Sequence, residues 1–215
     1  MLVKHLMSWP VVTVFDTSTV GESLELIKKK NIRHLPVVDV NQTLVGIATE
    51  TDLLKVFPNN KELSTFQLNL LSRTPIEKIM VPNLVCVSPD TIVEEAALAM
   101  RTNKISCLPV LNENGKMVGL LTKNDIIDAF IAALGLGEAG TRITILYKKK
   151  WGFLSELISF ADQRNVCIDN IVTFGPEIVL KVKGKSTDFI NDLHKAGYSV
   201  SDVSFIDAAP KSKAE

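Results

Sequence analysis

Leu35-Pro36-Val37, Val45-Gly46, Thr49 and Asp52 form a series that returns as Leu108-Pro109-Val110, Val118-Gly119, Thr122 and Asp125. Each residue of the second series lies 73 positions after its counterpart. The match extends without a gap over residues 4–55 and 77–128, where Met7/Met80 and Ile32/Ile105 are also in phase. A period of this length indicates a duplicated supersecondary unit whose copies bury their apolar faces against each other. The repeat also duplicates any ligand site that the unit carries.

Composition limits the class of protein. The 215 residues leave room for one large domain or two small ones, and 46% hydrophobic residues suffice for ordinary cores. Lys+Arg and Asp+Glu both number 24, so no net charge favours nucleic acid or an anionic membrane as a partner. The first residues run directly into the repeat without a signal-peptide pattern, and the apolar stretch 126–136 is too short to span a bilayer.

The three cysteines, Cys86, Cys107 and Cys167, are far apart and have apolar neighbours. Their odd number and wide spacing predict buried free thiols and a cytoplasmic location, without a metal site.

Local patterns predict the same elements in both repeats. The expected order is an extended leading segment, a helix, a strand, a polar turn, a second strand and a second helix. The extended segments are residues 10–14 and 84–87, the strands are 35–38 with 44–48 and 108–111 with 117–121, and the second helices begin near Thr49 and Thr122. The first helices show apolar stripes at Val20, Leu24 and Ile27 and at Val93, Ala97 and Met100. A further helix over 61–71 is expected in the connection between the repeats.

The last third of the chain follows a different pattern. Gly135-Leu-Gly137-Glu-Ala-Gly140 has the G-x-G-x-x-G form, but it follows a helix and precedes a strand, which is the wrong context for a dinucleotide loop and indicates a hinge. Residues 141–207 then predict strand, helix, hairpin, helix and strand, with Lys181 and Lys183 facing solvent. The predicted fold class is α/β (α+β): repeats over 1–57 and 76–134, a connection over 58–75, a hinge over 135–140, a ferredoxin-like βαββαβ domain over 141–207 and a disordered tail over 208–215.

The repeated Thr-x-x-Asp carries the chemistry. A Thr at a strand-to-helix junction places its hydroxyl beside unpaired helix amides, where a phosphate can bind. An Asp one turn later can accept hydrogen bonds from a ribose diol. The same spacing is close to a helix capping box, in which both residues serve only the helix. Two copies in register favour the ligand interpretation.

With these motifs, residues 1–133 resemble a tandem pair of CBS (cystathionine β-synthase) domains. The resemblance implies a pseudo-twofold pair with clefts for AMP, ADP, ATP or S-adenosylmethionine as a regulatory ligand. It implies that Asp52 and Asp125 hold ribose and that Thr49 and Thr122 hold ribose or phosphate. The implied adenine slots are Val12, Thr13, Val37 and Val38 in one repeat and Val85, Cys86, Val110 and Leu111 in the other. Basic residues within reach of the phosphates are Lys30, Arg33, His34, Lys104 and Lys123. Because Lys123 takes the place of Glu50, we expect the second cleft to prefer phosphorylated ligands more than the first.

The C-terminal pattern resembles an ACT domain, a regulatory module that often dimerises and binds amino acids. The family's acidic or polar residue and Pro at the first loop are replaced here by Lys148-Lys149-Lys150-Trp151, with Gly152 retained, which argues against amino-acid binding. This order of modules is similar to that of bacterial acetoin-utilisation proteins. It implies a homodimer that acts on its own oligomeric state or on a protein partner.

No pattern of an enzyme is present. The sequence has no G-x-S-x-G elbow, zinc-protease pair or P-loop, and His5, His34 and His194 lie in different elements without a nucleophile partner. We therefore expect a non-catalytic regulatory protein without a catalytic cofactor. The alternative is a scaffold whose CBS clefts are empty or vestigial.

Overall fold

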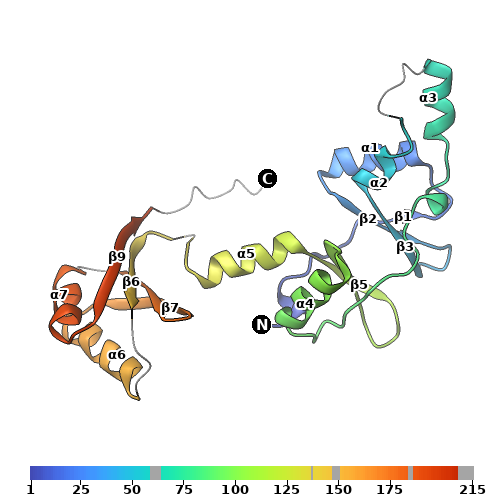
Figure 1. The fold of residues 1–215 in the computed structure, drawn as a ribbon. Helices are drawn as coiled ribbons and strands as arrows, with labels where there is room; N and C mark the ends of the chain where they lie inside the picture. Colours follow the sequence, from blue (N-terminus) through green and yellow to red (C-terminus); the bar gives the residue numbers. More distant parts are fainter. Residues whose placement is uncertain (59–63, 137, 147–150, 184–185, 208–215) are drawn as a thin grey trace. The chain divides into compact units, whose positions relative to one another are not determined.

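The computed structural model describes residues 1–58, 64–136, 138–146, 151–183 and 186–207. The chain divides into two compact units, Met1–Ile126 and Ile127–Glu215 (Figure 1). The first unit contains both repeats up to the start of the last repeat helix, and the second contains the βαββαβ region. The predicted tail over 208–215, Gly137 and the first residues of the helix expected over 61–71 lie outside the described residues.

The elements of the two repeats follow the same order. The first repeat contains β1 (Val14–Phe15), α1 (Val20–Lys30), β2 (His34–Val38), β3 (Leu44–Thr49) and α2 (Glu50–Leu54). The second contains α4 (Val93–Asn103), β4 (Cys107–Leu111), β5 (Met117–Thr122) and α5 (Lys123–Ala133). Between them lies α3 (Thr65–Ser72), and short 3-10 turns precede each repeat at η1 (Val3–His5) and η2 (Ile76–Lys78).

Local sequence explains the limits of the first helix in each repeat. The Thr19 hydroxyl accepts a hydrogen bond from the Glu22 amide, and the Glu22 carboxylate accepts one from the Thr19 amide, so a capping box starts α1. The helices α1 and α4 end at Asn31 and Lys104, which occupy the same repeat position and both have a left-handed backbone. In α1 the predicted stripe is buried at Val20 and Ile27 and partly buried at Leu24, whereas in α4 Ala96 is fully buried in place of Ala97.

The strands of each repeat form a small sheet. β1 lies parallel to β2, which pairs antiparallel with β3, and β4 pairs antiparallel with β5. The segments predicted as extended pair with a strand only near their ends. β1 begins only at Val14, and in the second repeat Val87 makes a single parallel bridge to Val110. Before Val14, residues Pro10, Val11 and Val12 instead line a cavity.

The two repeats exchange the segments that precede them. The Val3 amide donates to the Thr91 carbonyl at the start of α4, and the Ile76 amide donates to the Ser18 carbonyl at the start of α1, at 2.9 and 2.8 Å. Fully buried Val3 belongs to the core of the second repeat, and fully buried Ile76 belongs to the core of the first. The preceding segment of each repeat therefore completes the core of the other.

A methionine and a glycine that recur in both copies contact each other across this exchange. A Cβ placed on Gly46 would collide with the Met80 side chain, and one on Gly119 would collide with the Met7 side chain. Glycine at both positions leaves room for the methionine of the other repeat, which lies directly against the strand and would have to move for any larger residue.

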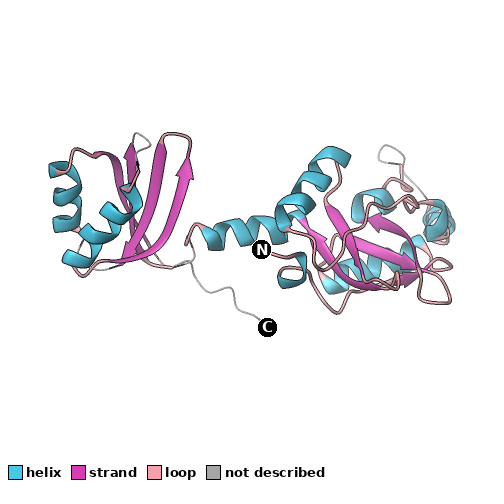
Figure 2. Cartoon of the chain, turned by 90° about the horizontal axis from the view of Figure 1, so that it is seen from below, coloured by secondary structure: helices cyan, strands magenta, loops and turns pink. Residues whose placement is uncertain are grey.

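The second unit is a four-stranded antiparallel sheet in the order β7-β8-β6-β9. Its elements are β6 (Gly140–Leu146), α6 (Phe153–Gln163), β7 (Cys167–Phe174), β8 (Glu177–Lys183), α7 (Thr187–Lys195) and β9 (Ser199–Ile206). Both helices cover the same face of the sheet (Figure 2). There, Leu157 and Ala161 of α6 and Phe189 and Leu193 of α7 pack in one cluster with Ile143 and Leu180 of the sheet.

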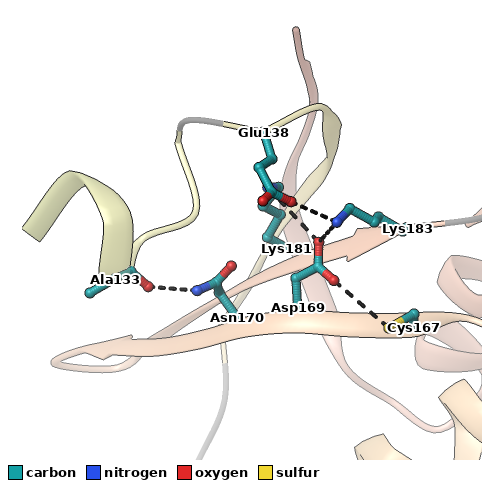
Figure 3. Close-up of polar contacts among 7 residues, drawn as sticks. All are labelled: Ala133, Glu138, Cys167, Asp169, Asn170, Lys181 and Lys183. Carbon is teal, nitrogen blue, oxygen red and sulfur yellow. Dashed lines mark hydrogen bonds and ion pairs between the residues drawn. The ribbon is translucent and has the colours of Figure 1, made fainter. Parts of the chain in front are cut away.

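The prediction that Lys181 faces solvent was wrong, whereas Lys183 is 48% exposed. The Lys181 side chain is only 2% exposed, because the segment between α5 and β6 lies over it. A Cβ on Gly135 or Gly140 would come within 2.8 or 2.9 Å of this side chain. Asp169 balances the buried charge, since its Oδ2 lies 3.9 Å from the Lys181 Nζ (Figure 3).

Further polar contacts hold the same segment on the sheet. Lys183 Nζ lies 3.1 Å from Asp169 Oδ2 and 2.7 Å from Glu138 Oε2. The Asn170 side-chain amide donates to the carbonyl of Ala133, the last residue of α5, at 2.7 Å (Figure 3). The glycine-rich segment predicted as a hinge is thus fastened to β7 and β8 at the positions that the structure describes.

All three cysteines are free, but their burial differs. Cys107 is buried and Cys86 is half-buried, whereas Cys167 is exposed at the start of the edge strand β7, which corrects the prediction of three buried thiols. Over the described ranges, no helix has the length and apolar character needed to cross a membrane.

Replacing Ile76 with Ala tests the exchange of segments. Ile76 is fully buried in the core of the first repeat, so its truncation is expected to lower the free energy of unfolding by about 2–5 kcal/mol. The matched control is Leu98→Ala on α4, where the side chain is 60% exposed and a change below about 0.5 kcal/mol is expected. Urea unfolding measures both variants. An equal, small effect of both would contradict the exchanged packing.

Candidate functional site

A cavity of about 660 Å³ opens in the first unit between the two repeats. From the first repeat it is lined by Ser8, Pro10, Val11, Val12, Asn31, Ile32, Arg33, His34, Thr49, Glu50 and Thr51. From the second it is lined by Ser106, Leu120, Thr122, Lys123 and Asn124. The sequence suggested a separate cleft for each Thr, but Thr49 and Thr122 both line this one cavity.

Backbone pairing at Ser8 brings the chain before β1 onto the second repeat. Ser8 exchanges two backbone hydrogen bonds with Leu120 of β5, at 2.9 and 3.2 Å. Its repeat counterpart Val81 does the same with Ile47 of β3, at 2.8 and 3.1 Å. The wall of the cavity at Ser8, Pro10, Val11 and Val12 is therefore positioned by the same exchange that closes the cores.

The two Thr-x-x-Asp segments form capping boxes. The Thr49 hydroxyl donates to Asp52 Oδ2 at 2.6 Å and accepts from the Asp52 amide at 3.2 Å. The Thr122 hydroxyl donates to Asp125 Oδ2 at 2.8 Å and accepts from the Asp125 amide at 3.3 Å. Each box starts a helix, α2 or α5, and leaves the Thr at the cavity wall while the Asp lies behind it.

The carboxylates of the two boxes differ in whether one oxygen remains without a hydrogen-bond partner. Asp52 Oδ1 accepts from Lys55 at 2.8 Å, so both oxygens of Asp52 have partners. Burial raises the pKa of Asp52, but the hydrogen bonds from Lys55 and Thr49 outweigh it and the pKa is lowered overall. Asp125 uses only Oδ2, and within the described part of the chain its Oδ1 has no hydrogen-bond donor. Among the described residues, Asp125 therefore keeps one oxygen without a partner, next to Thr122, which lines the cavity.

His34 connects the two repeats within the cavity. Its Nε2 lies 2.7 Å from the hydroxyl oxygen of Ser106, the repeat counterpart of Arg33. Burial and the neighbouring Arg33 charge lower the pKa of His34, while Asp125 raises it to a smaller extent. The imidazole is thus kept neutral at pH 7.

The cavity combines an apolar and a charged part. Val11, Val12, Ile32 and Leu120 supply aliphatic surface that suits a flat purine ring. Arg33 and Lys123 supply positive charge, which the single carboxylate of Glu50 only partly offsets. Such a site suits a ligand with an apolar ring at one end and a negative charge at the other.

The structure brings together some of the predicted site residues and not others. Val12, Arg33, His34, Thr49, Thr122 and Lys123 line the cavity. Thr13, Lys30, Val37, Val38, Asp52, Val85, Cys86, Lys104, Val110, Leu111 and Asp125 are not among its lining residues. Val37, Val38 and Val110 are instead buried in the cores of their repeats. Sequence reasoning missed Ser106 and Leu120, because the exchange that brings them to this wall cannot be read from local patterns.

Comparison with known proteins identifies the class. The CBS domain family matches residues 3–59 and 76–132, together more than half of the chain. The chain belongs to the CBS domain family and carries a tandem pair of these domains.

Three solved structures resemble the pair. The CBS domain pair of protein MJ0100, in complex with 5′-methylthioadenosine and S-adenosyl-L-methionine, is 32% identical, with a TM-score of 0.53, over 61% of this chain and 97% of that one. A putative acetoin utilization protein (AcuB) from Vibrio cholerae is 30% identical, with a TM-score of 0.53, over 63% and 94%. CBSX2 in complex with AMP is 29% identical, with a TM-score of 0.51, over 61% and 96%.

Among curated relatives, L-aspartate semialdehyde sulfurtransferase of Methanocaldococcus jannaschii is 33% identical over 129 residues. This match takes in 60% of the chain but only 23% of the relative. The similarity is therefore confined to a part of that enzyme.

The capping boxes generate a prediction about stability. Thr49→Ala and Thr122→Ala each remove a side chain that caps a helix, so each is expected to lower the free energy of unfolding by about 0.5–2 kcal/mol. Thr51→Ala is the control, because Thr51 is exposed and lies in the same cavity wall outside the box. Urea unfolding of the three variants measures the difference, and a loss for Thr51→Ala as large as for the caps would count against the boxes.

Proposed function

We propose that this protein is a non-catalytic regulator whose CBS pair binds an adenosine-containing ligand in the cavity between the repeats. The observation that carries the proposal is the meeting of Thr49 and Thr122 with Arg33 and Lys123 around one cavity that also has an aliphatic wall. The adenine would lie against Val11, Val12 and Ile32, and the charged part of the ligand would lie near Arg33 and Lys123.

The similar structures support this ligand class. CBS domain pairs 29% and 32% identical to the chain are complexes with AMP and with 5′-methylthioadenosine and S-adenosyl-L-methionine. AMP, ADP, ATP and S-adenosylmethionine are therefore the ligands to compare. Selective binding to the folded state raises its stability by mass action, so a saturable rise of the melting temperature would identify the ligand among these four.

We further propose that the second unit is a ferredoxin-like, ACT-like domain that serves oligomerisation or a second effector. Its βαββαβ order, the strand order β7-β8-β6-β9 and the placement of α6 and α7 on one face support this assignment. The module order, and the similarity of the pair to the Vibrio cholerae protein, support an architecture of the acetoin-utilisation type.

A scaffold with empty clefts is the second candidate function. It is favoured by the capping box at Asp52, because both carboxylate oxygens of that residue already have partners inside the protein. Calorimetric titration with the four adenosine ligands distinguishes the two functions. A scaffold would bind none of them.

The available oxygen of Asp125 predicts the result of one substitution. Asp125→Ala is expected to weaken binding of the adenosine ligand about ten- to a hundredfold, since a hydrogen bond to a charged acceptor contributes about 1.5–3 kcal/mol. Asp52→Ala is expected to have a smaller effect, because both of its oxygens already have partners within the protein. Calorimetric titration measures both affinities.

Asp128→Ala is the control for this comparison. Asp128 is exposed on α5, three residues beyond Asp125, and unlike Asp125 it makes no hydrogen bond to the cavity-lining Thr122. Unchanged affinity of Asp125→Ala would refute a contact with the ribose. The unfolding free energy of each variant shows whether a loss of affinity comes instead from loss of the helix cap.

Apolar side chains on the described surface predict an oligomer. Ile127 and Phe130 of α5 are each 54% exposed, and Phe205 of β9 is 70% exposed. Covering such side chains favours self-association, so the full chain is expected to scatter light with twice the mass of one chain. A chain ending at Leu134 shows which unit makes the contact. A monomer at all concentrations would contradict this prediction.

A further inference from the structure

We propose that His34 is a proton-linked specificity residue, which increases the preference of the cavity for phosphate-bearing adenosine ligands over adenosine as the pH falls. The inference rests on the proposed function and adds a form of regulation to it. Its basis is the place of one titratable side chain among the charges of the cavity.

The position of His34 is unlike that of the other two histidines. His34 begins β2, lies in the cavity wall and reaches Ser106 of the second repeat at 2.7 Å. His5 and His194 are exposed and line no part of the cavity. A change of charge on His34 is therefore felt by a ligand between the repeats, and a change on the other two is not.

Charged groups from several elements act on His34. Arg33 precedes it in the same wall, Lys123 and Glu50 face the cavity from the starts of α5 and α2, and Asp125 lies behind Thr122. Burial and the Arg33 charge lower the pKa of His34 in spite of Asp125. Without a ligand, the imidazole is thus uncharged over the neutral range.

A bound phosphate would raise the pKa of His34 again. Its negative charge beside Arg33 and Lys123 also stabilises the imidazolium form of His34, so binding takes up a proton. By linkage, the affinity for the anion must then rise as the pH falls through the range in which His34 titrates. Adenosine carries no phosphate and does not produce this effect.

The partner of His34 allows both charge states. A serine hydroxyl can donate to a neutral ring nitrogen or accept from a protonated one, so the contact with Ser106 survives the titration. Protonation thus changes the charge of the cavity without removing the link between the repeats. The residue acts on specificity and leaves the architecture in place.

The pH dependence of stability follows from the same environment. Because the pKa of His34 is lowered in the folded protein, its neutral form contributes stability above the ordinary value of 6.5, and this contribution is lost as the pH falls below it. A phosphate ligand opposes the loss.

The test compares AMP with adenosine on the full chain. Calorimetric titrations at about pH 7.5 and about pH 5.5 give the ratio of the two dissociation constants for the wild type and for His34→Asn. Titration of the free AMP phosphate, with a second pKa of about 6, is common to both proteins and cancels in the comparison. Between the two pH values, the preference for AMP in the wild type is expected to rise about tenfold relative to the variant, as for a shift of about one pKa unit.

Control variants and a second measurement complete the design. His5→Asn and His194→Asn are expected to behave as the wild type. AMP titrations in two buffers of different ionisation enthalpy measure proton uptake directly, and the wild type should take up more protons than His34→Asn. If His34→Asn does not fold, His34→Gln replaces it, and the proton uptake of the wild type is compared for AMP and adenosine.

The outcomes separate this inference from the proposed function. AMP binding with the same pH profile in the wild type and in His34→Asn would overturn the role of His34 and leave the ligand class intact. Absence of binding of AMP and adenosine at either pH would overturn the nucleotide site and this role together.

Discussion

The first unit depends on one constraint, the exchange between the repeats of the short segments that precede them. Val3 completes the core of the second repeat and Ile76 completes that of the first, so neither core is closed by its own copy. Burial of such aliphatic side chains is the dominant favourable term in folding. The methionines that follow lie against Gly46 and Gly119, which fixes the register of the exchange.

The same constraint builds the cavity. Pairing of Ser8 with Leu120 carries Pro10, Val11 and Val12 across to the second repeat, where they line the same cavity as Thr122 and Lys123. The first residues of the capped helices α2 and α5 line the same cavity. His34 contacts Ser106 of the other repeat in its wall. A ligand there would contact both repeats at once, so its binding free energy would be coupled to how the repeats are held together.

Much of the fold could be predicted from the sequence, because periodicity and turn chemistry are local. The strands β2, β3, β4 and β5 lie within a residue of their predicted limits, and the Thr-x-x-Asp segments do start helices. What could not be predicted depends on contacts between distant segments. Lys181 alternates with apolar residues like an outward side chain, yet a segment 40 or so positions earlier covers it. Ser106 carries no motif, and its place in the cavity wall beside His34 depends on how the two repeats meet.

The exchanged cores also have a consequence for how such a protein can be divided or inherited. A cut between the repeats, at any point of the connection over residues 56–75, would leave each half with the segment that belongs to its neighbour. Half-chains would have to find one another, or a second copy, to regain closed cores. The gene segment that behaves as an independent module is therefore the pair, and a single repeat is a fragment.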